Sequence, residues 1–368
     1  MNKQFHLNMF ALLLTFTCVA QTTPSAGDDI RVTFPTKFTV SAPLRDILNE
    51  KTREDDTEEI KKDHKRFPRN EQLNPNTLPV GDDPVWQKSE GSRQVNTIQN
   101  LLDWEGLAGG TPPDPTGAAG PNHYVQAVNS SFAVYDKKGK ILKSGTNLGT
   151  IWGSASEGDP IVMYDKYADR FFISQFASSP NRMLLAVSKT ADPLGQYYTY
   201  EFTFSAFPDY PKFGIWTDGY YFGCNLPGKS DVAVFERDKM LTGDKTARMV
   251  QKASGLSSGA NFIIQPGEAD GELPPLGTPN YMFFFEDDAW GSSSKDVIKV
   301  LEFKVDWKTI TNSTLAVSQT IETAPFDAAF TSSWNDVPQK GSSQKLDVLA
   351  GVTYMRAQYR KWAGYNSV

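Results

Sequence analysis

The chain of 368 residues carries 37 lysines and arginines against 43 aspartates and glutamates, which gives a net charge of −6 at pH 7. An acidic chain of this kind has no general attraction for nucleic acid or anionic lipid, and nucleic acid is not expected as a partner. Its 3 histidines and 2 cysteines are too few for the usual zinc sites, and a Ser-His-Asp triad would depend on His123. We expect His123, beside the turn at Asn122, to have a structural role.

The first twenty residues are typical of a secretory signal peptide. Lys3 precedes an apolar run that is too short to cross a bilayer, and Ala20 is a small residue that suits cleavage. We therefore expect export, with cleavage near Ala20 and a secreted or cell-surface location. A lipoprotein acylated at Cys18 is the alternative. No later segment reaches the roughly 20 apolar residues of a membrane helix, so no membrane span is predicted.

Residues 21–95 are predicted to form a polar, largely disordered leader. Between Arg45 and Arg69 there are eight basic and eight acidic residues with few apolar residues among them. Such a segment cannot bury enough surface to offset its ordering entropy. We interpret it as a solvated tether rather than a binding tail, with a short helix near 44–50 and Pro43 in its first turn.

Residues 96–368 are predicted to be all-β. Three stretches begin in the same way, with a strand, a tight turn and a second strand, and they start at Asp114, Asp159 and Asp209, at intervals of 45 and 50 residues. Two further strand-like apolar runs follow each of them. Four short strands per period predict a β-propeller built of four-stranded blades.

The last part of the chain predicts an incomplete propeller of four to five blades. A fourth unit is centred on 281–285, and a fifth begins at Leu346 before the chain stops at Val368. Because an array that stops within a blade leaves unpaired strand edges, two explanations are open. Residues 99–104 could supply a missing outer strand and close a five-bladed ring, or the chain is a truncated form of a longer protein. We favour truncation, because 359–362 show no turn or capping signal.

The repeated part of the chain contains three longer sequence words, PPDPTGAAGPNHYVQAVN (112–129), GDPIVMYD (158–165) and PDYPKFGIW (208–216). They resemble those of a family of secreted bacterial, propeller-like extracellular proteins without assigned chemistry. The resemblance runs from about residue 84 to the end of the chain and implies an extracellular propeller. It carries over no catalytic residue. Members often continue with surface-attachment or secretion-sorting modules, which this sequence does not show, so the mode of attachment stays open.

The candidate ligand-binding residues are Asp114, Asp159, Asp209 and Trp216. In a propeller the first strand of each blade lines the central channel, so carboxylates at its start could bind a cation or a polyhydroxylated ligand. Trp216 could stack on a sugar face. The alternative is that each aspartate accepts backbone N–H bonds in its own turn and that the tryptophan packs between blades.

A calcium site is the candidate for the acidic run Glu286, Asp287 and Asp288, and Glu268 with Asp270 and Glu272 forms a similar cluster. Calcium takes several oxygen ligands, which carboxylates supply. Neither cluster has the spacing of an EF-hand loop. Exposed acidic loop ends are the alternative.

We expect a secreted or cell-surface module that binds a protein or a glycan without catalysis. The alternative is a propeller glycoside hydrolase with paired Asp/Glu carboxylates. The turn at 165–171 resembles the aspartate box of sialidases, but it lacks the expected Ser and Gly and is interpreted as an ordinary hairpin. An enzyme needs converging carboxylates of perturbed proton affinity, whereas a binding module needs only an exposed patch.

Overall fold

The computed structural model describes residues 30–48, 102–110, 112–226, 231–256, 263–288, 293–326, 335–337, 339–347 and 356–368. Within these ranges the protein is nearly all β, and the only α-helix is α1 (Arg237–Thr242). The prediction of an all-β chain is confirmed. No helix in the described ranges is both long and apolar enough to cross a membrane. The predicted signal peptide and most of the predicted leader lie outside them.

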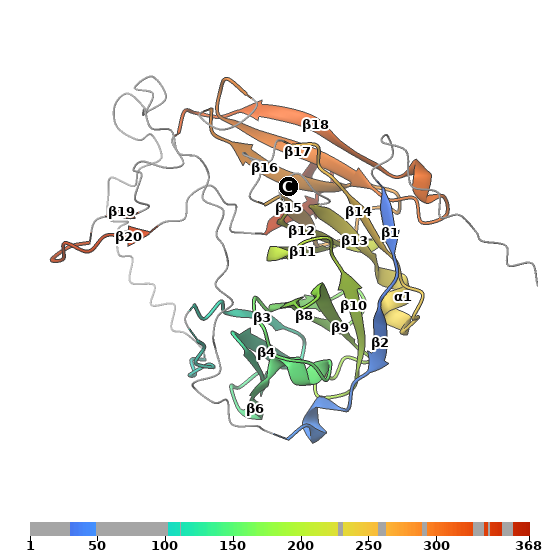
Figure 1. The fold of residues 1–368 in the computed structure, drawn as a ribbon, viewed down its shortest axis with the longest axis vertical. Helices are drawn as coiled ribbons and strands as arrows, with labels where there is room; N and C mark the ends of the chain where they lie inside the picture. Colours follow the sequence, from blue (N-terminus) through green and yellow to red (C-terminus); the bar gives the residue numbers. More distant parts are fainter. Residues whose placement is uncertain are drawn as a thin grey trace, which may run out of the picture.

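Four antiparallel sheets follow one another along the chain, and each contains four consecutive strands that pair in chain order (Figure 1). We name them units 1 to 4. Unit 1 contains β3 (Thr116–Ala119), β4 (His123–Val128), β5 (Ser131–Asp136) and β6 (Ile141–Asn147), and unit 2 contains β7 (Ile161–Asp165), β8 (Arg170–Ser178), β9 (Asn181–Ser188) and β10 (Tyr197–Thr203). Unit 3 contains β11 (Asp209–Ile215), β12 (Gly219–Asn225), β13 (Val232–Glu236) and β14 (Met249–Lys252), and unit 4 contains β15 (Gln265–Asp270), β16 (Asn280–Glu286), β17 (Val297–Lys304) and β18 (Thr314–Glu322).

The units stack face to face along an arc, from unit 1 at the bottom of Figure 1 to unit 4 at the top. The first strands of successive units touch: β3 contacts β7, β7 contacts β11, and β11 contacts β15. Between units 3 and 4 the backbones approach so closely that a Cβ on Gly214 would lie 2.3 Å from the carbonyl oxygen of Gly267. The first strand of unit 4 is therefore held against the first strand of unit 3.

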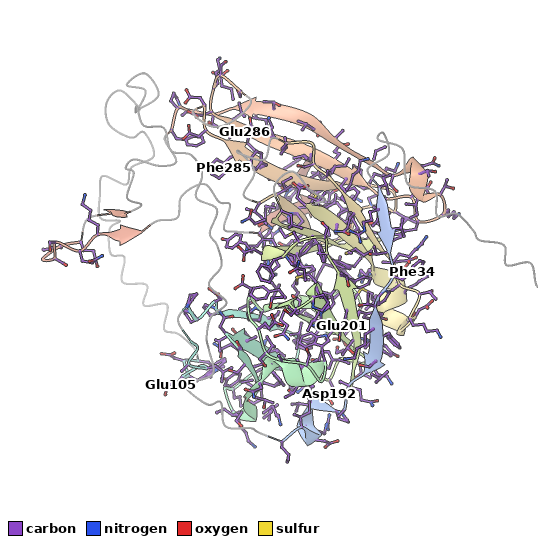
Figure 2. The ribbon with its side chains drawn as sticks, viewed as in Figure 1. Phe34, Glu105, Asp192, Glu201, Phe285 and Glu286 are labelled. Carbon is purple, nitrogen blue, oxygen red and sulfur yellow. The ribbon has the colours of Figure 1, made fainter. Side chains whose placement is uncertain are left out.

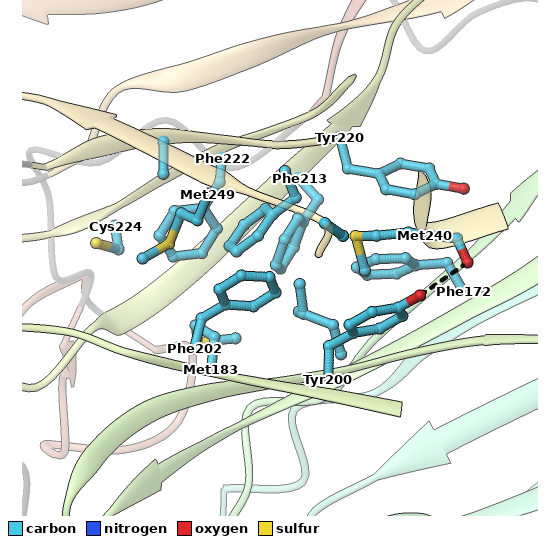
Figure 3. Packing of buried hydrophobic residues seen from close by; sticks show 14 of the residues in the cluster. Phe172, Met183, Tyr200, Phe202, Phe213, Tyr220, Phe222, Cys224, Met240 and Met249 are labelled. Atoms are coloured by element: carbon cyan, nitrogen blue, oxygen red, sulfur yellow. Dashed lines mark hydrogen bonds between the residues drawn. The ribbon is translucent and has the colours of Figure 1, made fainter. Parts of the chain in front are cut away.

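The middle sheets bury both faces, which explains their nearly continuous apolar runs. In β8, Phe171 and Ile173 pack into the cluster between units 1 and 2, whereas Phe172 and Phe176 pack into the cluster between units 2 and 3. Figure 3 shows this second cluster. Burying a side chain of this size stabilises the fold by roughly 1.5–3 kcal/mol. The stacked faces therefore supply most of the apolar stabilisation.

An N-terminal segment, residues 30–48, crosses the outer edges of two units, and we call it the strap. Its strand β1 (Arg31–Thr33) pairs antiparallel with β14, and β2 (Lys37–Val40) pairs antiparallel with β10. A short 3-10 helix, η1 (Leu44–Asp46), follows and buries Leu44 completely. Asp192 and Glu201 lie beside the strap in Figure 2 and form ion pairs with its Arg45 and Lys37.

The ordered strap differs from the disordered leader predicted for these residues. The charge run that supported disorder begins at Arg45, whereas 30–42 alternate β-branched or aromatic residues with polar ones. The ring of Phe38 lies 5.0 Å from that of Tyr200, so the alternation buries an aromatic face against β10. The helix predicted near 44–50 is the single 3-10 turn at Leu44–Asp46.

The C-terminal part does not form a separate fifth unit among the described residues. β19 (Asn335–Val337) and β20 (Leu346–Asp347) make a two-stranded sheet, β21 (Ala357–Lys361) pairs in parallel with β15, and β22 (Asn366–Ser367) pairs with β21. Unit 4 is thereby extended beyond its first strand. The ring of Trp104 lies against Tyr124 and Tyr135 of unit 1, and the described part of the predicted closing segment 99–104 forms no strand.

Replacing Leu44 by alanine tests the anchoring of the strap. Its side chain is fully buried, so Leu44→Ala should lower the free energy of unfolding by about 2–5 kcal/mol through lost burial and a cavity. Urea denaturation followed by tryptophan fluorescence measures the change. Leu48, which is 82% exposed, supplies the matched control, and Leu48→Ala should leave the midpoint nearly unchanged. Equal effects of the two substitutions would contradict an anchored strap.

Candidate functional site on the first strands

Asn129 brings two of the predicted aspartates together at the starts of units 1 and 2. Its side-chain Nδ2 donates to Asp114 Oδ2 at 2.6 Å and to the carbonyl of Pro112 at 3.0 Å, and its Oδ1 accepts from the backbone N–H of Asp159 at 2.9 Å. Asp114 and Asp159 both have left-handed backbone conformations, with φ of 37° and 43°. Asn129 was not singled out from the sequence, although it is the last residue of the 112–129 word.

The third aspartate and the tryptophan of the predicted site lie in different environments. Asp209 is the first residue of β11 and is paired in register with Asn225 of β12. Trp216 is fully buried, and its Nε1 donates to the carbonyl of Thr278 at 3.0 Å. An indole enclosed in this way cannot stack on a sugar from solvent. The ligand-stacking prediction for Trp216 is therefore wrong, and packing between units is its role.

The predicted calcium-binding residues divide into two groups. Glu286 is buried, and its Oε1 lies 2.6 Å from Lys299 Nζ, so a lysine already faces this carboxylate. Asp287, Asp288 and Asp296 offer carboxylate oxygens that lie within 4.8 Å of one another. Three such oxygens could contribute to a hard-cation site. The calcium prediction stays a prediction for Asp287 and Asp288, and Asp296, which lies across the β16–β17 connection, was missed.

The other acidic pair binds cations of the chain itself. The guanidinium Nη1 of Arg356 lies 3.2 and 3.1 Å from the two carboxylate oxygens of Glu268. Asp270 accepts from Lys166 Nζ at 3.0 Å and from Arg360 Nε at 2.7 Å. Protein cations therefore occupy the positions that the sequence suggested for calcium at Glu268 and Asp270.

Glu268 and Asp270 lie two residues apart on β15, but their different surroundings shift their pKa values in opposite directions. Burial raises the pKa of Glu268, and the charge of Arg356 opposes the shift. Hydrogen bonds from Arg360 and Lys166 lower the pKa of Asp270. Divergent values of this kind are typical of acid–base pairs in enzymes. Here each carboxylate is engaged by an arginine from beside or within β21, so the arrangement serves to hold a strand.

The strand β21 occupies a defined slot beside β15. Its Tyr359 is 2% exposed, with its ring 5.0 Å from Trp216 in an edge-on contact and 6.1 Å from Tyr281 in a stacked one. Arg356 also donates from Nη2 to the carbonyl of Val162 in β7 at 3.3 Å. We call the edge of β15 at 267–270, with these two aromatic rings and this carbonyl, the β15 slot. It joins surfaces of units 2, 3 and 4.

The β7–β8 turn reaches the far end of the slot. Tyr167 Oη lies within hydrogen-bond distance of the carbonyls of Ala269 and Gly271, at 3.1 and 3.0 Å, and Lys166 contacts Asp270 from the same turn. Desolvation is the main cause that raises the pKa of Tyr167 to about 12. The phenol therefore stays protonated and can donate at neutral pH. Unit 2 is thus connected to unit 4 across the first strand of unit 3.

A buried ion pair fixes this turn. Asp165 is completely buried and accepts from Arg237 Nε at 2.6 Å, from Arg237 Nη2 at 3.0 Å and from Tyr220 Oη at 3.0 Å. Its Oδ1 also accepts the backbone N–H groups of Tyr167 and Ala168, each at 3.2 Å. The carboxylate therefore ties the turn of unit 2 to unit 3, and the turn places Lys166 and Tyr167 on β15.

Comparison with known proteins gives little. No family model matches this sequence, and no curated protein matches it either. Among solved structures, the catalytic domain of a GH62 α-L-arabinofuranosidase from Coprinopsis cinerea is 10% identical, with 59% of this chain and 70% of that chain covered and a TM-score of 0.30. A protein from Lactobacillus plantarum is 13% identical over 60% and 74% of the two chains, with a TM-score of 0.24. Likenesses this weak support no assignment.

Substitution of Asp165 tests the anchoring of the turn. Asp165→Asn removes the buried counter-charge of Arg237 and leaves only the exposed carboxylate of Asp238, 3.8 Å away. It should lower the free energy of unfolding by roughly 3–5 kcal/mol, measured by urea denaturation. The matched control is the pair of Lys295 and Glu322, whose side chains are 60% and 59% exposed. Glu322→Gln should change stability by less than about 1 kcal/mol. Similar losses in both variants would contradict the structural role of Asp165.

The lowered pKa of Asp270 predicts a pH dependence. A carboxylate with a lowered folded-state pKa adds stability above its ordinary value of 3.8, and this stability is lost as the pH falls through the folded-state value. Asp270→Asn should therefore lower the melting temperature at pH 7. The gap to the native chain should close progressively in acid below pH 3.8. Thermal denaturation across this range measures it, and a gap that persists undiminished in acid would contradict the prediction.

Proposed function

We propose that this chain is an exported, incomplete β-propeller that acts outside the cell as a protein-binding module, and that it binds extended polypeptide segments along sheet edges. Four consecutive four-stranded sheets with touching first strands support the propeller. The signal peptide predicted at 1–20 supports export. The single observation that carries the binding mode is that three segments from outside the four units add to sheet edges, as β1 on β14, β2 on β10 and β21 on β15.

Edge addition favours a polypeptide ligand over a glycan. An added strand gains affinity from main-chain hydrogen bonds and specificity from alternate side chains. The buried indole of Trp216 offers no face to a sugar, and the carboxylate of Asp114 is engaged by the amide of Asn129. The features that suggested glycan binding therefore support packing and turn formation instead.

The same geometry favours binding over hydrolysis. A glycosidase needs two carboxylates that face its substrate from either side of the scissile bond. Glu268 and Asp270 have different proton affinities, yet both are neighbours on one strand and both contact arginines. Their arrangement fits a strand-holding site better than a hydrolytic one.

Selection from a displayed library of random peptides tests the function on the full chain, with a glycan array and aryl glycosides assayed in parallel. We expect enrichment of peptides that alternate apolar and polar residues, and protection of edge-strand amides from hydrogen exchange when such a peptide is bound. A version of each peptide with a central proline is the matched control, because it lacks an N–H for the ladder. Retention of glycans or release of sugar without any peptide binding would overturn the proposal.

A further inference from the structure

The β15 slot contains the one strand that the described units take up in parallel. All other described strand pairs are antiparallel, whereas β21 pairs with β15 in the register Gly267 to Ala357 through Asp270 to Arg360. Residues 323–356 separate β21 from β18, the last strand of unit 4. The strand in the slot therefore comes from a part of the chain that lies about 90 residues after β15 in the sequence.

We propose that the β15 slot is a recognition site for an extended basic peptide of the pattern Arg-x-x-Tyr-Arg, carried by a partner protein, and that residues 356–360 of this chain are a resident copy which such a peptide displaces. This inference rests on the proposed function and names the ligand class for one of its edges. The pattern follows from what the slot offers at each position of the strand.

The acidic side of the slot selects the two arginines. Arg360 lies opposite Asp270 in the ladder and contacts its carboxylate at 2.6 Å, while Arg356 reaches Glu268 and the carbonyl of Val162. A planar guanidinium suits this arrangement, because it can donate to a carboxylate and a carbonyl from separate nitrogens. An acidic peptide would meet like charge at both positions and would be rejected.

The other side of the slot selects the tyrosine. Successive residues of a strand point to opposite faces, so Tyr359 is directed away from the two arginine contacts. It lies opposite Ala269, a small residue, and is enclosed by the rings of Trp216 and Tyr281. An aromatic residue between the arginines therefore packs against these two rings, and only 2% of its surface stays exposed there.

The resident segment is held in a way that permits exchange. The side chains of Arg356 and Arg360 are 39% and 51% exposed, so salt weakens their ion pairs, and only Tyr359 is deeply buried. As a tethered ligand it competes at an effective concentration in about the millimolar range. A free peptide should therefore bind weakly to the native chain and much more tightly when the resident copy is disabled.

The experiment uses a fluorescein-labelled peptide with the sequence of residues 354–364 and the full chain, measured by fluorescence anisotropy. The resident copy is disabled by the combined substitutions Arg356→Ala, Tyr359→Ala and Arg360→Ala. We expect this triple variant to bind the peptide at least tenfold more tightly than the native chain, and added NaCl to weaken the binding. If the triple variant does not fold, as judged by circular dichroism, the double variant Arg356→Ala/Arg360→Ala replaces it.

Two controls make the site assignment specific. Adding Glu268→Gln and Asp270→Asn to the disabled chain should abolish binding, whereas adding Glu322→Gln on the exposed pair should not. A peptide with both arginines replaced by glutamate should not bind. Failure of a folded disabled chain to bind more tightly than the native chain, or equal binding of the charge-reversed peptide, would overturn the proposal.

The outcome is separable from that of the proposed function. If library peptides protect the edges of β6 or β18, the outer strands that the strap does not cover, while the 354–364 peptide does not bind, the protein-binding function stands and the β15 slot assignment falls. If no peptide protects any edge, both fall.

Discussion

The fold depends on how the open edges of its sheets are satisfied. The apolar faces of the sheets are already covered, because each middle unit buries both of its faces against its neighbours. A sheet that is not closed on itself still presents unpaired N–H and C=O groups along its outer strands, and such edges pair readily with any extended chain. Two of the four outer edges, those of β10 and β14, are covered by the strap, and the first-strand edge of unit 4 is covered by β21.

Covering these edges also connects the units. The strap pairs with unit 3, then with unit 2, and then inserts Leu44 into the cluster between units 1 and 2. On the side of the first strands, Asp165 joins unit 2 to unit 3, and its turn joins unit 2 to unit 4 through Tyr167. Both connections span more than one stacked interface. These connections oppose the separation of neighbouring units. Apolar burial also opposes it, but burial is not directional and does not fix how one sheet is aligned with the next.

The sequence predicted the strands and hairpins that form between residues close together in the chain. β3 and β7 begin two residues after Asp114 and Asp159, and β11 begins at Asp209, because apolar runs and turn residues mark the strands wherever hairpins join neighbours. The strap was missed because its strands were averaged with the charge run that follows. The β21–β15 ladder was missed for another reason: Arg356 and Glu268 are 88 residues apart, and no periodicity reports a pairing at that distance.

The misjudged site residues show the same limit at the level of single side chains. Trp216 and the acidic pair on β15 suggested binding sites by their residue types, but their chemistry is set by what packs on them. With β21 in place, burial raises the pKa of Glu268, and the guanidinium of Arg356 opposes that shift from 88 residues away. A basic strand in the slot and an ionised Glu268 therefore favour each other, because a guanidinium stabilises the carboxylate form. This mutual dependence is the physical basis of the selectivity for a basic segment that we propose for the slot.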